Sequence, residues 1–137
     1  MSALVLDCSL AMAWCFEDEA SAAADAILER VRDDGALVPA LWVWEVANVL
    51  TLAARRGRIG GGDVAARLAL MTALPIRVDD EGVARAWRET ALLAQAETLT
   101  VYDAAYLELA LRMGADLATL DTELRSAAVR VGVRVLP

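Results

Sequence analysis

Ala3-Leu4-Val5-Leu6-Asp7-Cys8-Ser9, near the start of the chain, is the stretch that decides the fold. Its four consecutive apolar residues are typical of a strand buried on both faces, as in the middle of a parallel sheet. Asp7 then lies at the carboxyl edge of that sheet, where open α/β proteins place their chemistry. Ser9 can cap the next helix or hold the Asp7 carboxylate. Asp7 alone could simply mark a strand end, but three later acids occupy similar junctions.

Length and composition indicate one domain covering residues 1–137. Hydrophobic residues make up 58% of the chain and the mean hydropathy is +0.45, yet no apolar run approaches the roughly 20 residues of a membrane helix. We therefore expect an apolar surface that dimerises or binds a partner. The start of the chain lacks the basic flank of a signal peptide. A cytoplasmic location is the default, and Cys8 and Cys15 are expected to be buried thiols rather than a disulfide.

Two residue types are absent, and their absence excludes many chemistries. Without histidine the chain has no Ser-His-Asp relay, no imidazole base and no His-ligated zinc. Without lysine it has no P-loop lysine or Schiff base, and it departs from receiver domains and haloacid-dehalogenase-like phosphatases, which begin similarly. The net charge of −7 argues against bulk attraction to nucleic acid, but not against an enzyme that reaches phosphate through a bound cation.

Strands and helices alternate along the chain. Strands are predicted at 3–6, 36–38, 75–78, 116–120 and 133–135, and helices at 10–16, 20–32, 41–56, 63–73, 81–96, 103–113 and 123–131. The pattern predicts an α/β fold with a parallel sheet, right-handed crossovers and helices on both faces. The helix at 81–96 is expected to carry four apolar residues on one side: Val83, Trp87, Ala91 and Leu92.

Four acids are predicted to meet at one edge of this sheet. Asp7 and Asp121 each follow a strand, and Asp103 lies in the first turn of its helix. Glu45 lies about a turn and a half into the helix after the second strand. Crowded carboxylates repel one another and take up protons unless a cation neutralises them. Oxygen-only ligands favour Mg²⁺ or Mn²⁺, and such a site suits phosphodiester hydrolysis by metal-activated water.

Other acids compete for this role and are given structural interpretations. Asp79-Asp80 follows an expected edge strand and suits a helix start. Asp116 is expected to begin its strand, and Glu108 is expected to solvate its helix.

Arginines and tryptophans allow more than one interpretation. One basic cluster can hold RNA phosphates, contact a partner or solvate a helix end: Arg55, Arg56 and Arg58. Three tryptophans can stack bases, although core packing or a partner groove is favoured: Trp14, Trp42 and Trp44. Trp42 and Trp44 cannot point the same way from one helix, so at least one is expected at a groove or interface.

Four short motifs follow one another in order. They are Leu6-Asp7-Cys8-Ser9; Pro39 with Trp44-Glu45-Val46-Ala47-Asn48; Tyr102-Asp103-Ala104-Ala105-Tyr106-Leu107-Glu108-Leu109-Ala110; and Thr119-Leu120-Asp121-Thr122-Glu123-Leu124. Over nearly the whole chain, their order and spacing resemble a PIN domain, and specifically the ribonuclease toxins of VapBC toxin–antitoxin pairs. Two departures are the run Gly60-Gly61-Gly62 and the lack of lysine, which leaves RNA binding to arginine.

The resemblance implies a five-stranded parallel sheet, a Mg²⁺-dependent endoribonuclease, a VapB-like antitoxin as partner and a homodimer. Carried over residue by residue, Asp7 and Asp103 would be the principal metal ligands. Glu45 and Asp121 would complete the acidic set, directly or through water. Three residues would support the acids by hydrogen bonds: Ser9, Asn48 and Thr119. The spacing agrees for Asn48, which shares a helix face with Glu45.

Two other functions fit parts of the sequence. One is a PIN fold that binds a partner and never cleaves, and the intact acidic set disfavours it. The other is a carboxylate-metal phosphatase acting on small molecules, and the chain lacks the lysine and second aspartate usual in such enzymes.

Overall fold

A parallel sheet is the centre of the fold. The computed structural model describes residues 3–137, in which five strands form one all-parallel sheet in the order β3-β2-β1-β4-β5. The strands are β1 (Leu4–Leu6), β2 (Ala36–Val38), β3 (Ile76–Val78), β4 (Asp116–Ala118) and β5 (Val135–Leu136). The predicted α/β fold is confirmed, and β3 is an edge strand as expected.

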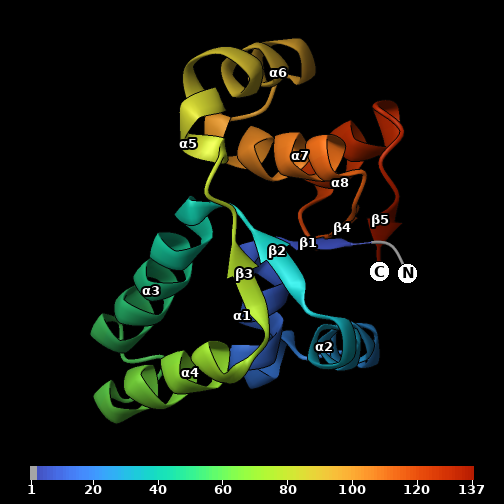
Figure 1. Cartoon of the computed structure of the whole chain (residues 1–137). Helices are drawn as coiled ribbons and strands as arrows, with labels where there is room; N and C mark the ends of the chain where they lie inside the picture. Colours follow the sequence, from blue (N-terminus) through green and yellow to red (C-terminus); the bar gives the residue numbers. More distant parts are fainter. Residues whose placement is uncertain (1–2) are drawn as a thin grey trace.

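Helices cover both faces of the sheet, with α1 to α4 on one side and α5 to α8 on the other (Figure 1). Their bounds are α1 (Cys8–Cys15), α2 (Ala22–Asp34), α3 (Ala40–Arg55), α4 (Gly61–Ala73), α5 (Gly82–Arg85), α6 (Ala91–Glu97), α7 (Val101–Met113) and α8 (Thr122–Arg130). A 3₁₀ turn (Glu17–Glu19) follows α1, and a π-helical turn (Ala86–Thr90) joins α5 to α6. Within residues 3–137, no helix has the length and apolar character needed to cross a membrane.

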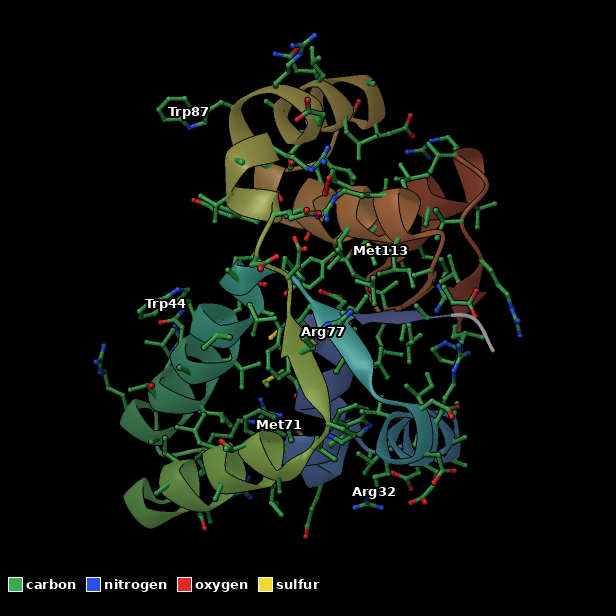
Figure 2. All side chains as sticks on the ribbon, in the orientation of Figure 1. Arg32, Trp44, Met71, Arg77, Trp87 and Met113 are labelled. Atoms are coloured by element: carbon green, nitrogen blue, oxygen red, sulfur yellow. The ribbon has the colours of Figure 1, made fainter. Side chains whose placement is uncertain are left out.

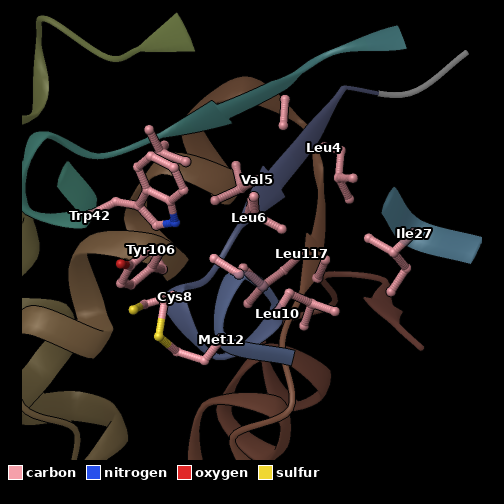
Figure 3. Close-up of a cluster of buried hydrophobic side chains, with 14 of the residues drawn as sticks. Leu4, Val5, Leu6, Cys8, Leu10, Met12, Ile27, Trp42, Tyr106 and Leu117 are labelled. Atoms are coloured by element: carbon pink, nitrogen blue, oxygen red, sulfur yellow. The ribbon is translucent and has the colours of Figure 1, made fainter. Parts of the chain in front are cut away.

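Strand β1 is the innermost strand, as its unbroken apolar sequence predicted. Val5 pairs with Leu37 of β2 and with Leu117 of β4, and Val5 and Leu6 are completely buried. Figure 3 shows the strand among buried side chains that include Leu10 of α1. A strand between two parallel neighbours has helices above and below, so neither of its faces can be polar. The first polar position available is therefore the residue that follows it, Asp7.

The segment predicted as a single helix at 81–96 differs most from expectation. It is interrupted by the π-helical turn, and the side that was predicted to be apolar faces solvent: Val83, Trp87 and Leu92 are all exposed. Trp87 is 97% exposed. A π turn contains an extra residue and so changes the phase of the helix. As a result, Thr90 and Ala94 are the residues buried along this segment.

The tryptophans and cysteines follow the sequence-based expectations. Trp42 is buried, whereas Trp44 is 77% exposed, so the two point in different directions from α3. Trp14 is half-buried and donates its indole N–H to the carbonyl of Ala24 at 2.9 Å. Cys8 and Cys15 are free buried thiols, as predicted.

Arg112 of α7 holds together the elements beyond β3. Its guanidinium contacts Asp79 at 2.7 Å, Glu108 at 2.8 Å and Glu81 at 3.2 Å, measured between nitrogen and oxygen. The expectation that Glu108 solvates its helix was wrong, because Glu108 is buried. Arg112 lies one helical turn after Glu108 in α7, and Arg85 of α5 lies 3.8 Å from the Glu108 carboxylate. Hydrogen bonds from Arg112 lower the pKa of Asp79.

Replacing Arg112 should expose the cost of this buried cluster. We expect Arg112→Met to lower the free energy of unfolding by about 3 kcal/mol, because it leaves two buried carboxylates without their cation. Urea denaturation at neutral pH measures the change. Arg32→Met removes a pair with Glu29 in which both side chains are more than half exposed, so this control should cost less than about 1 kcal/mol. Equal losses in the two variants would contradict the assignment.

Candidate functional site

Asp7 lies at the end of β1 with its carboxylate buried between two hydroxyl groups. Its Oδ2 accepts hydrogen bonds from Ser9 Oγ and from Thr119 Oγ1, each at 2.7 Å. Burial raises the pKa of Asp7, the two hydroxyls lower it, and the nearby charge of Asp121 raises it. Ser9 therefore holds the carboxylate. It does not cap α1, because that helix begins at Cys8 with Asp7 in the N-cap position.

The same two hydroxyls connect the ends of β1 and β4. Ser9 Oγ accepts a hydrogen bond from the Leu120 N–H at 2.9 Å, and Thr119 Oγ1 accepts one from the Asp121 N–H at 3.0 Å. Asp121 in turn caps α8, since its Oδ1 accepts from the Leu124 N–H at 3.0 Å. Two of the predicted supporting residues, Ser9 and Thr119, thus fix the backbone that carries two of the predicted acids.

Glu45 reaches the site from α3 and contacts Tyr106 of α7. The hydroxyl of Tyr106, a completely buried residue, donates to Glu45 Oε1. Burial raises the pKa of Glu45, the Tyr106 hydrogen bond lowers it, and the charges of Asp7 and Asp103 raise it. Sequence reasoning did not select Tyr106. Its position three residues after Asp103 is the signal that could have identified it, because that spacing places two side chains on one side of a helix.

Asp103 lies in the first turn of α7, as predicted. Its N–H donates to Thr100 Oγ1, the N-cap of the helix, at 3.1 Å. Burial and the charges of Asp121, Asp7 and Glu123 together raise the pKa of Asp103 to about 6. Glu123 is an exposed residue that sequence reasoning did not select. The charges of these carboxylates influence one another, as expected of acids that share the carboxyl edge of the sheet.

In the described part of the chain these four acids have no cationic partner. Within residues 3–137, no arginine forms an ion pair with Asp7, Glu45, Asp103 or Asp121. The competing acids are different, because each of the buried ones is paired. Asp79 and Glu108 bind Arg112, and Asp116, which begins β4 as expected, lies 3.2 Å from Arg30. The negative charge at the sheet edge is therefore left for something outside the chain to neutralise.

Two other predicted features stand apart from the acids. Asn48 lies one turn after Glu45 on α3 and is exposed, and no hydrogen bond in the described part of the chain joins it to the acids. Arg58 contacts Asp18 at 2.7 Å and Glu19 at 2.8 Å, and its guanidinium lies 3.8 Å from the centroid of the Phe16 ring. Arg58 thus fastens the turn between α3 and α4 to the 3₁₀ turn.

The donor set suits a hard divalent cation. All four groups are carboxylates, and the oxygen-only set matches Mg²⁺ or Mn²⁺ better than zinc or copper. Across residues 3–137, however, no three acidic or cysteine side chains are arranged to hold a metal ion among them. Mg²⁺ is commonly held by one or two carboxylates and several waters, so it does not need such a preformed group. The residues fit the cation by their chemistry and their unbalanced charge.

Taken together, the fold and the site define an α/β domain with an acidic carboxyl edge supported by hydroxyl groups. The PIN domain family model matches residues 4–130, and the chain belongs to this family, whose members are generally nucleases that use divalent metal ions. No curated protein matches the chain.

Two solved structures are similar in fold. PAE2754 from Pyrobaculum aerophilum has a TM-score of 0.71 and 22% sequence identity, with 98% of this chain and 83% of that chain covered. FitAcB from Neisseria gonorrhoeae has a TM-score of 0.68 and 17% identity, with 98% of this chain and 96% of that chain covered. At such low identity these structures establish the arrangement of the elements.

The crowded acids should make the metal-free protein more stable at mildly acidic pH. Asp103, with a pKa of about 6, takes up a proton in the folded state at a pH well above the ordinary aspartate pKa of about 3.9. The stability that this protonation adds to the folded state is fully present below about pH 4 and is lost as the pH rises through 6. We therefore expect the free energy of unfolding in EDTA to rise by about 1 kcal/mol when the pH is lowered from about 7 to about 5.

Urea denaturation at the two pH values measures this change, and Asp103→Asn should reduce it. The chain has no histidine, so carboxylates are the side chains expected to titrate in this range. A lower free energy of unfolding at pH 5 than at pH 7 would contradict the crowding of the acids.

Proposed function

We propose that the protein is a Mg²⁺-dependent endoribonuclease, and that it is the toxin of a type II toxin–antitoxin pair of the VapC kind. The observation that carries the proposal is a set of four carboxylates with which no arginine in residues 3–137 forms an ion pair. Buried acids elsewhere in the chain have cationic partners, so this charge is not a general property of an acidic protein. An edge that attracts a divalent cation suits a polyanionic substrate such as RNA.

In this proposal each acid has a distinct place. Asp7 and Asp103 are the principal metal ligands, and Glu45 and Asp121 complete the set directly or through water. A bound Mg²⁺, with Mn²⁺ as a plausible substitute, would supply a water of lowered pKa and neutralise charge on the phosphate. Ser9 and Thr119 hold the Asp7 carboxylate in one orientation, and Tyr106 does the same for Glu45. Asn48 is exposed on α3, and we propose that its side chain turns towards the acids and supports them by a hydrogen bond.

The proposed partners and location rest on the sequence motifs rather than on any contact in the structure. The resemblance to VapBC toxins supports a VapB-like antitoxin as partner, RNA as substrate and the cytoplasm as location. The fold is also similar to that of FitAcB, which agrees with the proposed family.

Removing one proposed ligand should abolish cleavage while leaving the fold intact. We expect Asp103→Asn to lower the rate of RNA cleavage by at least about 100-fold, because even residues that only support a metal ligand commonly account for 10- to 100-fold. Labelled RNA incubated with the pure protein, with Mg²⁺ or with EDTA, measures the rate. Induced expression in a bacterial host tests toxicity, which should be lost in parallel.

Asp80→Asn is the matched control. Asp80 is an exposed carboxylate after the edge strand β3, so its loss should change neither rate nor toxicity. Full Mg²⁺-dependent cleavage by folded Asp103→Asn would refute the assignment. No cleavage by the wild type would favour a non-cleaving binding module, and release of phosphate from small esters instead would favour a phosphatase.

Metal affinity should depend on pH. Protons compete with the cation for crowded carboxylates, and Asp103 is mostly protonated at about pH 5 because its pKa is about 6. We expect Mg²⁺ to bind at least about 10-fold more weakly at pH 5 than at pH 7 in calorimetric titrations. The Asp80→Asn variant should show the same dependence as the wild type. Equal affinities at both pH values would count against a site shared by these acids.

A further inference from the structure

A recess of about 230 Å³ lies where α5 and the π-helical turn meet the first turns of α3 and α7. Its wall is mainly apolar and includes Leu41, Val83, Ala86 and Val101. Figure 2 shows Trp44 and Trp87 pointing outward, and neither of these rings lines the recess. An apolar cavity of about 150 Å³ is enough to take up benzene, so the recess has room for a flat ring system from outside the chain.

Thr90 of the π-helical turn places a hydroxyl group in this apolar wall. The residue lines the recess, is only 3% exposed, and its hydroxyl forms no hydrogen bond in the described part of the chain. A helical threonine can donate to the carbonyl four residues earlier, as Thr72 does to Leu68 at 2.9 Å. For Thr90 that carbonyl belongs to Ala86, and it accepts instead from the Ala91 N–H. A buried hydroxyl without a partner is costly, and a ligand that bonds to it would remove that cost.

Two carboxylates add hydrogen-bond acceptors to the recess. Asp79 and Glu108 line it, and Arg112 balances their charges through ion pairs at 2.7 and 2.8 Å. Each carboxylate oxygen has more than one lone pair, so these groups can accept from a ligand as well as from Arg112. The lining therefore combines apolar walls and acceptors with a hydroxyl that can donate or accept. A flat heterocycle with N–H groups on its edge matches it better than an aliphatic side chain does.

Tyr102 adds an accessible aromatic ring beside the recess. It belongs to the lining and is 67% exposed, so one part of it faces the hollow while the rest remains open to solvent. Proteins that bind single-stranded RNA stack its unpaired bases on rings of this kind. A nucleobase is also a flat ring system with polar edges, which is the shape and chemistry that the recess accommodates.

The recess adjoins the acidic edge through two helices. On α7, Tyr102 of the recess directly precedes Asp103, and the Cα atoms of successive residues are about 3.8 Å apart. On α3, Leu41 of the recess lies one turn before Glu45, on the same side of the helix. A base held in the recess is therefore attached to a backbone that passes close to these acids.

We propose that the recess is a base-specificity pocket, in which one nucleobase of single-stranded RNA inserts between the apolar walls, bonds to Thr90 and lies against Tyr102. Adenine, cytosine and guanine carry an amino group that suits the acceptors of Asp79 and Glu108, whereas both exocyclic groups of uracil are acceptors themselves. The inference rests on the proposed function, which supplies RNA as the substrate. It adds which bases are selected and which side chains select them.

Nuclear magnetic resonance tests the pocket without any cleavage of RNA. The isotope-labelled full chain is titrated in EDTA with adenosine, cytidine, guanosine or uridine, and the amide signals of Ala86, Thr90 and Tyr102 should shift. Uridine should bind at least about 3-fold more weakly than the others. Thr90→Val should weaken adenosine binding by about 2- to 10-fold, the value of one hydrogen bond. Thr72→Val is the matched control and should leave binding unchanged, because the Thr72 hydroxyl is exposed on α4 and bonded to its own helix.

Filling the recess gives a second variant. Ala86→Leu places a larger side chain in it and should weaken adenosine binding at least about 10-fold. Short single-stranded RNAs that differ in one base next to the cleaved bond then test specificity. The ratio of kcat/KM between the adenine and uracil RNAs should fall in Thr90→Val and in Ala86→Leu, while the affinity for Mg²⁺ stays unchanged. Circular dichroism confirms that each variant is folded.

The possible outcomes separate the pocket from the proposed function. The pocket is overturned if no nucleoside shifts these amide signals, or if Thr90→Val and Ala86→Leu bind adenosine as tightly as the wild type. Shifts produced by N-acetyl-leucinamide and by no nucleoside would assign the recess to a protein side chain, which also overturns it. A wild type that binds nucleosides in the recess and cleaves no RNA supports the pocket and refutes the proposed function.

Discussion

The hydrogen bonds that the Asp7 carboxylate accepts from Ser9 and Thr119 are the contacts on which the site depends. A carboxylate at the end of the innermost strand is desolvated, and burial is the largest influence on its pKa. Two hydroxyl donors at 2.7 Å offset part of that cost. The donors come from opposite ends of the chain, so satisfying Asp7 also requires β1 and β4 to end side by side. The same contacts then set the start of α8 through Asp121.

Asp7 is accompanied by three other acids whose negative charge no ion pair within residues 3–137 neutralises. Thirteen arginines are available, and several pair with acids elsewhere, including buried ones. Within residues 3–137 none of them forms an ion pair with the acids at the carboxyl edge, and this costs stability, because burial and the charges of neighbouring acids raise the pKa of Glu45 and of Asp103. Such local destabilisation is expected where a protein keeps a place for an external charge. The strand ends are thus held firmly by hydrogen bonds, while the carboxylates that they carry repel one another.

The sequence determined most of the fold because its three inner strands, β1, β2 and β4, are buried. Runs such as Leu4–Leu6 and Ala36–Val38 cannot be accommodated at a surface, so Asp7, directly after the first run, and Glu45, in the helix after the second, are placed on the same edge of the sheet. The segment at 81–96 could not be read in the same way. Helical spacing predicts which residues share a side, but it does not predict whether that side faces the core or the solvent, and no local pattern marks the π turn. Glu108 was misread for a related reason: its partner Arg112 was visible at helical spacing, but the burial of both depends on how α5 packs.

The acidic site shares α3 and α7 with two exposed aromatic side chains, Trp44 and Tyr102, and the spacing of residues on a helix explains how. Successive residues on an α-helix are about 100° apart. Trp44 beside Glu45, and Tyr102 beside Asp103, therefore project from adjoining sides of the same helix turn. One side of each helix turns an acid towards the ends of β1 and β4, and the next side turns an aromatic ring outward. A shift of either helix that repacked the aromatic face would also move a carboxylate.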